Sequence, residues 1–440
     1  MGYVLLMLFS IAANWLVGLS IDKAKKRGES GRKALILGIT INLLPLAFFK
    51  YGNFLTDNIN SILSALDLGS VALDDVHLPI GISFFTFQAI SYIVDIYRHE
   101  AEVQKNPVNL ALYISLFPQL IAGPIVRYHD VAKEIIERRT TAADFRYGVL
   151  RFVAGLAKKV LIANNLGALA DHIFSLPPGE LSAGLAWLGL IAYTLQIYYD
   201  FSGYSDMAIG LGRMFGFHFL ENFNYPYISR SISEFWRRWH ISLSSWFRDY
   251  LYIPLGGNRV GLARNYFNLV MVFFLCGLWH GASWTFVIWG LYHGSFLVLE
   301  RSPVGRLLEK LPSPIQHVYT LLVVMIGWVF FRSESIDQAT EYLSALVNFS
   351  GLPYLDARLF AAMNTEFYLA LAVGVLFATP LLPAVKNWLN NKLDCISSFG
   401  VIVLKGSTTA ALMAWIVAMM VYSSAELMSG THNPFLYFRF

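Results

Sequence analysis

The chain has 440 residues, of which 56% are hydrophobic, 15% aromatic and only 14% charged. Because a soluble domain carries roughly 25% charged residues and leaves part of its chain surface exposed, this composition excludes a water-soluble globular protein and predicts a polytopic membrane protein. The net charge of +4 is too small to indicate a nucleic-acid partner, and two cysteines, Cys276 and Cys395, exclude a disulfide framework and a cysteine-type zinc cluster.

Apolar stretches of about 20 residues, the length at which a helix crosses a bilayer, recur along the whole sequence. We expect an all-α fold in one transmembrane domain, residues 1–440, with about nine to eleven spans and with re-entrant or broken helices. Residues 1–20 lack the basic leader and cleavage site of a signal peptide and are interpreted as the first span. The expected spans are Tyr3–Ser20, Ala34–Phe49, Pro79–Tyr97, Val108–Val126, Phe145–Leu169, Ser182–Tyr199, Asn265–Leu299, Ile315–Phe331, Glu366–Leu382 and Ser407–Leu427.

Basic residues predict the orientation of the first spans, because short loops rich in Lys and Arg stay in the cytoplasm. Residues 22–33 contain six basic and two acidic residues, which indicates a cytoplasmic loop. The next loop, residues 50–78, contains four Asp and one Lys, which indicates the outer side, and residues 127–146 carry five basic residues. The apolar run 108–126 would then begin and end in the cytoplasm.

That run contains Pro118, Gly123 and Pro124, which break a helix because proline has no N–H and clashes with the preceding turn. Broken backbone at membrane depth is tolerated only where protein or a water-filled cavity covers it. We interpret 108–126 as a re-entrant or kinked element that lines an internal cavity. An ordinary kinked span is the alternative.

Residues 228–264 mix arginines with aromatic residues. Phe235, Trp239, Ser242 and Trp246 recur at helical spacing and predict an aromatic stripe on one face of a helix. Arginine side chains can reach lipid headgroups from such a helix, so we expect an interfacial helix on the cytoplasmic surface. The alternative is that the Trp and Arg side chains only anchor the protein at the interface.

The run Asn265–Leu299 has 35 residues without Asp, Glu, Lys or Arg. Since two spans need about 40 residues and a turn, we expect one tilted helix that breaks at 277–283 and continues. His280 would then lie deep in the membrane beside glycines that leave room for a substrate. An intramembrane imidazole indicates function by default and suits general-base catalysis. A packing role is the alternative.

Other candidates carry less chemistry. His293 lacks a paired glycine break and is interpreted as structural, whereas His240 is a second catalytic candidate. Cys276 lies one helical turn before His280, where a covalent role competes with the commoner role of a small core residue. The three histidines do not show the close ligand spacing of a metal site, so no metal is expected.

Seven segments, in order along nearly the whole chain, resemble the membrane-bound O-acyltransferase family, and within it the members that O-acetylate alginate. They are Pro79–Gln88, Tyr199–Gly210, Asn222–Tyr227, Phe235–Ser244, Tyr252–Asn258, Gly277–Trp284 and Asn433–Phe440. The resemblance is specific for the family and less specific for the polysaccharide acceptor. Members usually begin with further hydrophobic helices before the segment that Tyr3–Ser20 resembles, so the expectation is that the chain either starts late or is a shortened variant.

The resemblance implies that His280 matches the family's essential intramembrane histidine and His240 its second signature histidine. It implies a funnel-shaped fold in a bacterial inner membrane, embedded in membrane lipid, where donor and acceptor meet from opposite sides. The donor would be a cytoplasmic thioester, acetyl-CoA or an acyl carrier, with no permanently bound cofactor. An acceptor hydroxyl, deprotonated by neutral His280, would attack its carbonyl. Extracytoplasmic acetyltransferase partners would then deliver the acetyl group to a polysaccharide.

Arg237, Arg238 and Arg248 are the predicted contacts of the donor phosphates. Two other functions remain open. A transporter or flippase could move an acyl carrier or glycan without acyl chemistry, and the broken segments 117–124 and 277–283 suit it, although no internal symmetry is visible. The third possibility is a lipid or D-alanyl O-acyltransferase of the same family.

Overall fold

A computed structural model describes residues 2–121, 123–349, 357–393 and 398–429. Within these ranges the chain forms helices and no strand, which confirms the predicted all-α fold. Cys395 and the segment 433–440, both named in the sequence analysis, lie outside the described residues.

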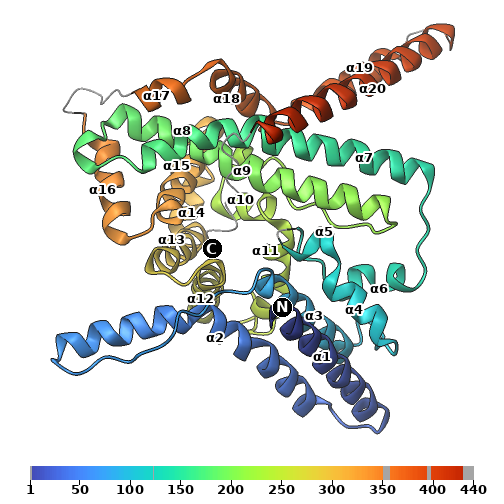
Figure 1. Cartoon of the computed structure of the whole chain (residues 1–440), viewed down its shortest axis with the longest axis vertical. Coiled ribbons are helices and arrows are strands. Elements are labelled where there is room, and N and C mark those ends of the chain that lie inside the picture. Colours follow the sequence, from blue (N-terminus) through green and yellow to red (C-terminus); the bar gives the residue numbers. More distant parts are fainter. Residues whose placement is uncertain (1, 122, 350–356, 394–397, 430–440) are drawn as a thin grey trace.

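The described residues form α-helices that range from four to 34 residues and four short segments with 3-10 or π geometry. In chain order they are α1 (Gly2–Lys26), α2 (Arg32–Ala65), α3 (Ile82–Arg98), α4 (Pro107–Ser115), α5 (Phe117–Leu120), α6 (Tyr128–Ile136), α7 (Ala142–Ala157), η1 (Lys158–Ala163), α8 (Asn164–Phe174), η2 (Pro178–Glu180), α9 (Ala183–Met214), η3 (Pro226–Ile228), α10 (Ile232–Arg238), α11 (Ile241–Phe247), η4 (Arg248–Tyr252), α12 (Leu262–His280), α13 (Trp284–Arg301), α14 (Pro303–Leu308), α15 (Ser313–Arg332), α16 (Ile336–Val347), α17 (Ala357–Ala362), α18 (Thr365–Phe377), α19 (Leu381–Leu393) and α20 (Ser398–Met428). Figure 1 shows α1–α3 on one side of the molecule, α7–α9 on the other, and α10 and α11 between them.

The second helix is much longer than the predicted span Ala34–Phe49. It runs for 34 residues with Pro45 inside it and ends at Ala65. Lys50 and Asp57 therefore lie on a helix and not in an outer loop, so the expected loop boundary is wrong. Backbone hydrogen bonding does not stop where the apolar residues stop, so hydropathy does not mark the end of a helix.

The predicted break in 108–126 is present. The run divides into α4 and the four-residue α5, with Leu116 in an extended conformation between them. The buried Gln119 donates from its Nε2 to the carbonyl oxygen of Tyr113 at 2.9 Å, which satisfies a backbone group left free by the break. Ile121, just after α5, lines the cavity described below.

Glycines bring α7 and α9 into backbone contact. A Cβ atom on Gly155 would lie 2.5 Å from the carbonyl oxygen of Gly203, and one on Gly148 would lie 2.5 Å from that of Gly210. Small residues allow such close approach, which is how helices associate in lipid without a hydrophobic force between them. This pair lies on the side of the molecule opposite the N-terminal helices (Figure 1).

The uncharged run 265–299 folds into two helices that turn back on each other, so the expected continuing helix is wrong. Gly277 of α12 lies against α13, where an added Cβ would be 2.3 Å from the carbonyl oxygen of Phe286. Further along α13, a Cβ on Gly290 would be 2.3 Å from the carbonyl oxygen of Phe273. The glycines therefore permit an antiparallel hairpin with its turn at 281–283.

Fewer helices than the predicted nine to eleven have the length and composition of a membrane span. Six qualify among the described residues, or seven if the pair Thr365–Phe377 and Leu381–Trp388, bent by 63°, forms one span. The six are Tyr3–Lys26, Arg32–Ala65, Ala142–Phe174, Leu262–His280, Ser313–Arg332 and Ala410–Met428. Two further predicted runs fall in α3 and α9, which are buried along most of their length. A helix enclosed by protein is as apolar as one in lipid, so composition does not separate the two.

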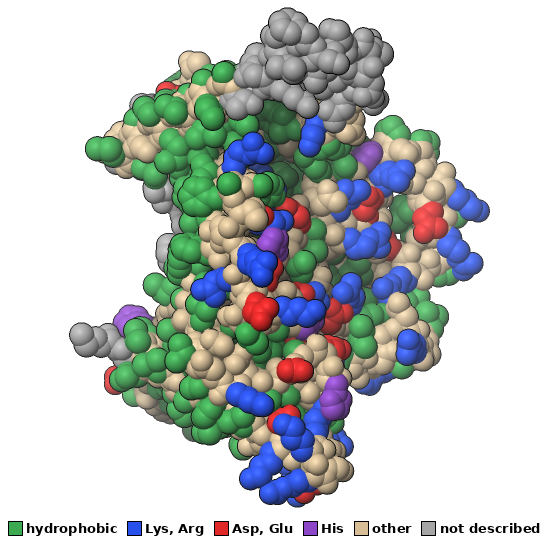
Figure 2. All heavy atoms as spheres, turned by 90° about the vertical axis from the view of Figure 1, so that its right-hand side faces the viewer, with side chains coloured by type: hydrophobic (Ala, Val, Ile, Leu, Met, Phe, Trp, Pro, Cys, Tyr) green, Lys and Arg blue, Asp and Glu red, His purple; other side chains and the backbone are tan. Residues whose placement is uncertain are grey.

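Charged side chains gather on one face of the molecule. Figure 2, a view of the right-hand side of Figure 1, shows a band of Lys, Arg, Asp and Glu there, with hydrophobic side chains at its borders. Lys25 donates to the carbonyl oxygen of Tyr97, so the basic loop 22–33 lies beside the C-terminal end of α3. Arg98, at the same end, donates to the carbonyl oxygen of Asp249 at 3.0 Å. The basic loop and η4 therefore share one end of the fold, and the start of α3 lies at the other.

Candidate active site

His280 is the last residue of α12 and lines a cavity at the start of α3. Its side chain is 8% exposed, and the cavity measures about 150 Å³. The lining comes from four parts of the chain: Lys50, residues 78–84, Ile121, and the pair Trp279 and His280. The structure therefore places the predicted catalytic histidine beside a space that can hold a small substrate group.

Lys50 is a component of this site that the sequence analysis missed. Its ammonium group donates to the carbonyl oxygens of Trp279 and His280, the latter at 3.2 Å, and lies 3.5 Å from the Ser83 hydroxyl. The last carbonyl groups of a helix have no intrahelical partner, and a cation there also interacts favourably with the helix dipole. Lys50 thus holds the end of α12 on which His280 lies. A lysine within a membrane-length helix is itself a signal of function that could have pointed to it.

The glycines next to His280 do not provide the expected room for a substrate. A Cβ on Gly281 would lie 2.2 Å from the ring of Phe286, and Gly277 touches the backbone of α13. Residues of α13 occupy the space beside both glycines, so the prediction that these glycines leave room for a substrate is wrong. The open space lies on the opposite side, toward α3 and Lys50.

His240 is buried, whereas the sequence predicted it on an interfacial helix. Its side chain is 1% exposed, and its backbone adopts a left-handed conformation with φ 44° where α11 begins. The imidazole Nδ1 lies 3.1 Å from Asn222 Oδ1. Removal from water disfavours the charged form and lowers the pKa of His240 to about 3. His240 is therefore neutral at physiological pH.

The interfacial interpretation of 228–264 is also wrong for the aromatic stripe. Phe235, Trp239 and Trp246 are buried in the core of the protein. The predicted single helix is divided into α10, α11 and the π-helix η4, which turns these rings toward neighbouring helices. Phe235 and Trp239 stack on each other, but Trp246, beyond the break, stacks on Phe87 of α3, so the residues do not form one stripe on a single helix.

An aromatic layer connects the two histidines. The Trp279 ring contacts both, with its centroid 6.3 Å from the His240 ring and 5.0 Å from the His280 ring. Phe87 of α3 stacks on both Trp246, at 3.7 Å, and Trp279, at 5.4 Å. The rings of the two predicted catalytic residues therefore share Trp279 as a neighbour, although His240 does not line the cavity of His280.

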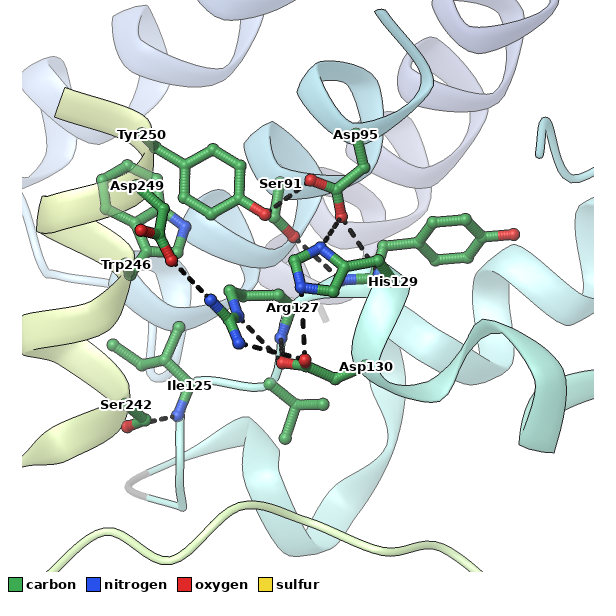
Figure 3. A network of polar contacts seen from close by, with 12 residues as sticks. Ser91, Asp95, Ile125, Arg127, His129, Asp130, Ser242, Trp246, Asp249 and Tyr250 are labelled. Atoms are coloured by element: carbon green, nitrogen blue, oxygen red, sulfur yellow. Dashed lines mark hydrogen bonds and ion pairs between the residues drawn. The ribbon is translucent and has the colours of Figure 1, made fainter. Parts of the chain in front are cut away.

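A network of ion pairs lies at the charged, C-terminal end of α3 (Figure 3). Arg127 reaches Asp249 of η4 at 2.6 Å and Asp130 of α6 at 2.9 Å. His129 lies between Asp95 of α3, 2.9 Å away, and Asp130, 3.2 Å away. The network thereby joins α3, α6 and η4. Beside it, the Ile125 N–H donates to Ser242 Oγ at 2.9 Å, and Ser242 is two residues after His240 in the sequence.

His129 in this network is a cation. Hydrogen bonds with Asp130 and Asp95 raise the pKa of His129 to about 10, against the opposing effect of partial burial. Asp95, Glu100 and His129 each present a ligand atom within 4.8 Å of the others. A metal-bound histidine must be neutral, yet both ring nitrogens here contact carboxylates, so the cluster fits an ion-pair network better than a metal centre.

Raising the pH should destabilise the protein through His129. Because its pKa is raised on folding, its stabilisation is complete below about pH 6.5, the ordinary histidine value, and is lost as the pH rises toward about 10. The unfolding temperature of the detergent-solubilised protein should fall across this range, and His129→Gln should remove much of that fall. His77→Gln, at an exposed histidine, is the control. An unchanged pH dependence in His129→Gln would contradict the assignment.

The three predicted phosphate contacts differ in their surroundings. Arg237 is exposed and has no ion pair within the described part of the chain. Arg238 pairs with Glu234 at 2.9 Å, and Arg248 pairs with Asp249 at 2.7 Å. All three lie outside the cavity of His280. Their role toward a donor remains a prediction.

Cys276 and His293 lie outside the cavity of His280. Cys276 is buried on α12, one turn before His280. His293 is 0% exposed and packs against the rings of Trp236 and Trp289, at 5.0 and 5.2 Å. Neither lines the His280 cavity, and their proposed roles as core residues remain predictions.

Comparison with known proteins relates the chain to a family of acyltransferases. A model of the membrane-bound O-acyltransferase family matches residues 41–310, more than half of the chain. The "Probable alginate O-acetylase AlgI" of Azotobacter vinelandii is 42% identical over 97% of this chain and 89% of its own length. The protein of that name from Pseudomonas aeruginosa is 48% identical over 76% of this chain and 64% of its own length, and the "Peptidoglycan O-acetyltransferase" of Helicobacter pylori is 34% identical over 100% and 88%. The chain is therefore a multi-pass membrane enzyme, an O-acyltransferase that belongs to the membrane-bound O-acyltransferase family.

Proposed function

We propose that this enzyme takes an acetyl group from a cytoplasmic thioester, acetyl-CoA or an acyl carrier, and passes it across a bacterial inner membrane for O-acetylation of an exported polysaccharide such as alginate. The names of the relatives support an acetyl donor and a polysaccharide acceptor. Extracytoplasmic acetyltransferase proteins would complete the delivery to sugar hydroxyls. The observation that carries the proposal is the position of His280 in a cavity at the opposite end of α3 from the charged network.

The two ends of α3 give donor and acceptor separate approaches. With 17 residues and a rise of about 1.5 Å per residue, α3 is roughly 25 Å long. The basic loop 22–33 lies beside its C-terminal end, which the positive-inside rule places in the cytoplasm. A second cavity of about 530 Å³, lined by Arg98, Arg127 and His129 among others, opens at that end. The His280 cavity then faces outward, where the acceptor would enter.

The transfer needs one base and one leaving group. Neutral His280 takes the proton of an acceptor hydroxyl while the hydroxyl oxygen forms a bond to the thioester carbonyl carbon. The carbon–sulfur bond then breaks, and the imidazolium returns the proton to the thiolate. The product is an ester and a free thiol, with no change in oxidation state. Arg237 has no ion pair within the described part of the chain and could bind the donor phosphates directly, whereas Arg238 and Arg248 would have to exchange partners.

Inside-out membrane vesicles from an alginate-producing bacterium that lacks its own acetylase, but expresses this chain, test the proposal. Acetyl-CoA labelled with ¹⁴C in the acetyl group and ³H in the CoA is added outside, at the cytoplasmic face. Transfer predicts ¹⁴C on polysaccharide in the lumen and ³H-labelled CoA thiol outside. Equal accumulation of both labels in the lumen would instead show transport without chemistry, and absence of both from the lumen would contradict acetyl transfer.

A further inference from the structure

The side chain of Asn222 lies at the centre of a buried hydrogen-bond cluster around His240. It follows α9 in the chain and is 1% exposed. Its Oδ1 accepts from the Ser242 N–H at 3.2 Å and from the Ser242 hydroxyl at 2.9 Å, and it lies 3.1 Å from His240 Nδ1. Its Nδ2 donates to Ser205 Oγ at 2.9 Å. One amide thus contacts both α9 and the start of α11.

These contacts determine which nitrogen of His240 carries the proton. A backbone N–H can only donate, so the Asn222 atom that faces the Ser242 N–H must be the amide oxygen. The same oxygen faces His240 Nδ1, and an oxygen without a proton can only accept. His240 Nδ1 therefore carries the hydrogen, and in a neutral imidazole Nε2 is then left with its lone pair.

His240 Nε2 is buried and has no hydrogen-bond partner within the described part of the chain. Unpaired buried polar atoms are uncommon and costly, and they recur where a ligand supplies the missing partner. The left-handed backbone of His240 adds a second sign, because strained non-glycine residues cluster at functional sites. The neighbouring backbone supports this conformation, with Ile241 N–H donating to the Asn222 carbonyl oxygen at 2.9 Å.

We propose that Asn222 is a positioning residue that holds His240 in the Nδ1-protonated tautomer, so that Nε2 accepts a hydrogen bond from an O–H or N–H group of a substrate. The proposal rests on the proposed acyl transfer. In this tautomer His240 cannot donate from Nε2 to an oxyanion, which separates its role from that of an oxyanion-stabilising donor. The hydrogen could belong to the acceptor hydroxyl or to an amide N–H in the arm of the thioester donor.

Three substitutions test the positioning role. Asn222→Ala removes the oxygen that orients His240 and should lower kcat by at least about 10-fold. Ser205→Ala is the matched control, because it removes a hydrogen bond of the same amide but leaves Oδ1 in place, and kcat should stay within about 3-fold. Asn222→Asp keeps an acceptor oxygen and should rescue kcat. Its carboxylate favours the imidazolium, so the acid limb of the pH–rate profile should move to higher pH. His280, whose ring also contacts the Trp279 ring, is a titratable group of another element that lies near His240.

The Michaelis constants identify the source of the substrate hydrogen. An increase confined to the KM of acetyl-CoA in Asn222→Ala assigns it to the donor arm, and an increase confined to the acceptor KM assigns it to the hydroxyl. Equal losses of kcat in Asn222→Ala and Ser205→Ala, each in proportion to the loss of stability, would overturn the proposal. An unshifted pH profile in Asn222→Asp would do the same.

The tautomer can be measured without any turnover. Ring ¹⁵N spectra of protein labelled at histidine, compared with the His240→Gln protein, should show a protonated Nδ1 and an unprotonated Nε2 for His240. The opposite pattern would disprove the inference. Because this measurement needs no substrate, failure of acyl transfer in the wild-type protein would count against the proposed function and leave the tautomer assignment to be judged separately.

Discussion

Replacing His280 with alanine is expected to lower acyl transfer by at least about 100-fold, because the reaction loses the base that accepts the hydroxyl proton. The protein should still reach the membrane in near-normal amount. No hydrogen bond of the His280 ring is present within the described residues, and the ring packs against Trp279, Trp289 and Phe331, so its removal costs packing but leaves no polar partner unpaired. Acetyl esters on the polysaccharide and the quantity of membrane protein are measured on the same samples.

His293→Ala is the matched control for this experiment. It removes another buried histidine, surrounded by aromatic rings as His280 is, but away from the cavity. His280→Gln, closer in size to the native residue, separates lost chemistry from lost packing. We expect both His280 variants to be inactive and the His293 variant to lose stability more than activity. A stable His280→Ala protein with normal acetylation would end the general-base mechanism.

Replacing Lys50 with methionine is expected to produce the second-largest loss, at least about 10-fold in kcat. The change leaves the buried carbonyl groups of Trp279 and His280 without their donor, which costs about 1–3 kcal/mol for each group left unsatisfied. The end of α12 can then move relative to the cavity. A displacement of the catalytic group by about 1 Å is enough for a large loss of rate. Activity and the unfolding temperature are both measured.

Tyr51→Phe provides the comparison for Lys50. The Tyr51 hydroxyl donates to the carbonyl oxygen of Leu278 at 2.6 Å, so its removal also frees a carbonyl at the end of α12, but outside the cavity. We expect Tyr51→Phe to lower stability with little loss of kcat, and Lys50→Arg to retain part of the activity. If Lys50→Met and Tyr51→Phe lose activity in the same proportion to stability, Lys50 serves only the helix end and has no particular effect on His280.

Several features of the fold were predicted from the sequence because they depend on short stretches of chain. Apolar composition predicts a helical membrane protein, since in lipid each backbone group must be bonded within its own helix. Proline at 118 and glycines in 277–283 predicted the breaks at Leu116 and at 281–283. His280 was found because an imidazole in a run of 35 uncharged residues is conspicuous without any knowledge of contacts.

Other features were decided only by the tertiary structure, because they depend on contacts between distant segments. Lys50 bonds to carbonyl oxygens 229 and 230 residues away, and no local pattern records that pairing. His240 was placed at the membrane surface because Arg and Trp alternate around it, whereas its burial follows from its packing against α9 and α12. The apolar runs of α3 and α9 resemble spans, since hydropathy reports that a helix avoids water but not whether lipid or protein covers it. The membrane class and the helix breaks can therefore be predicted from the sequence, whereas the enclosure of the site by protein is decided by how the helices pack.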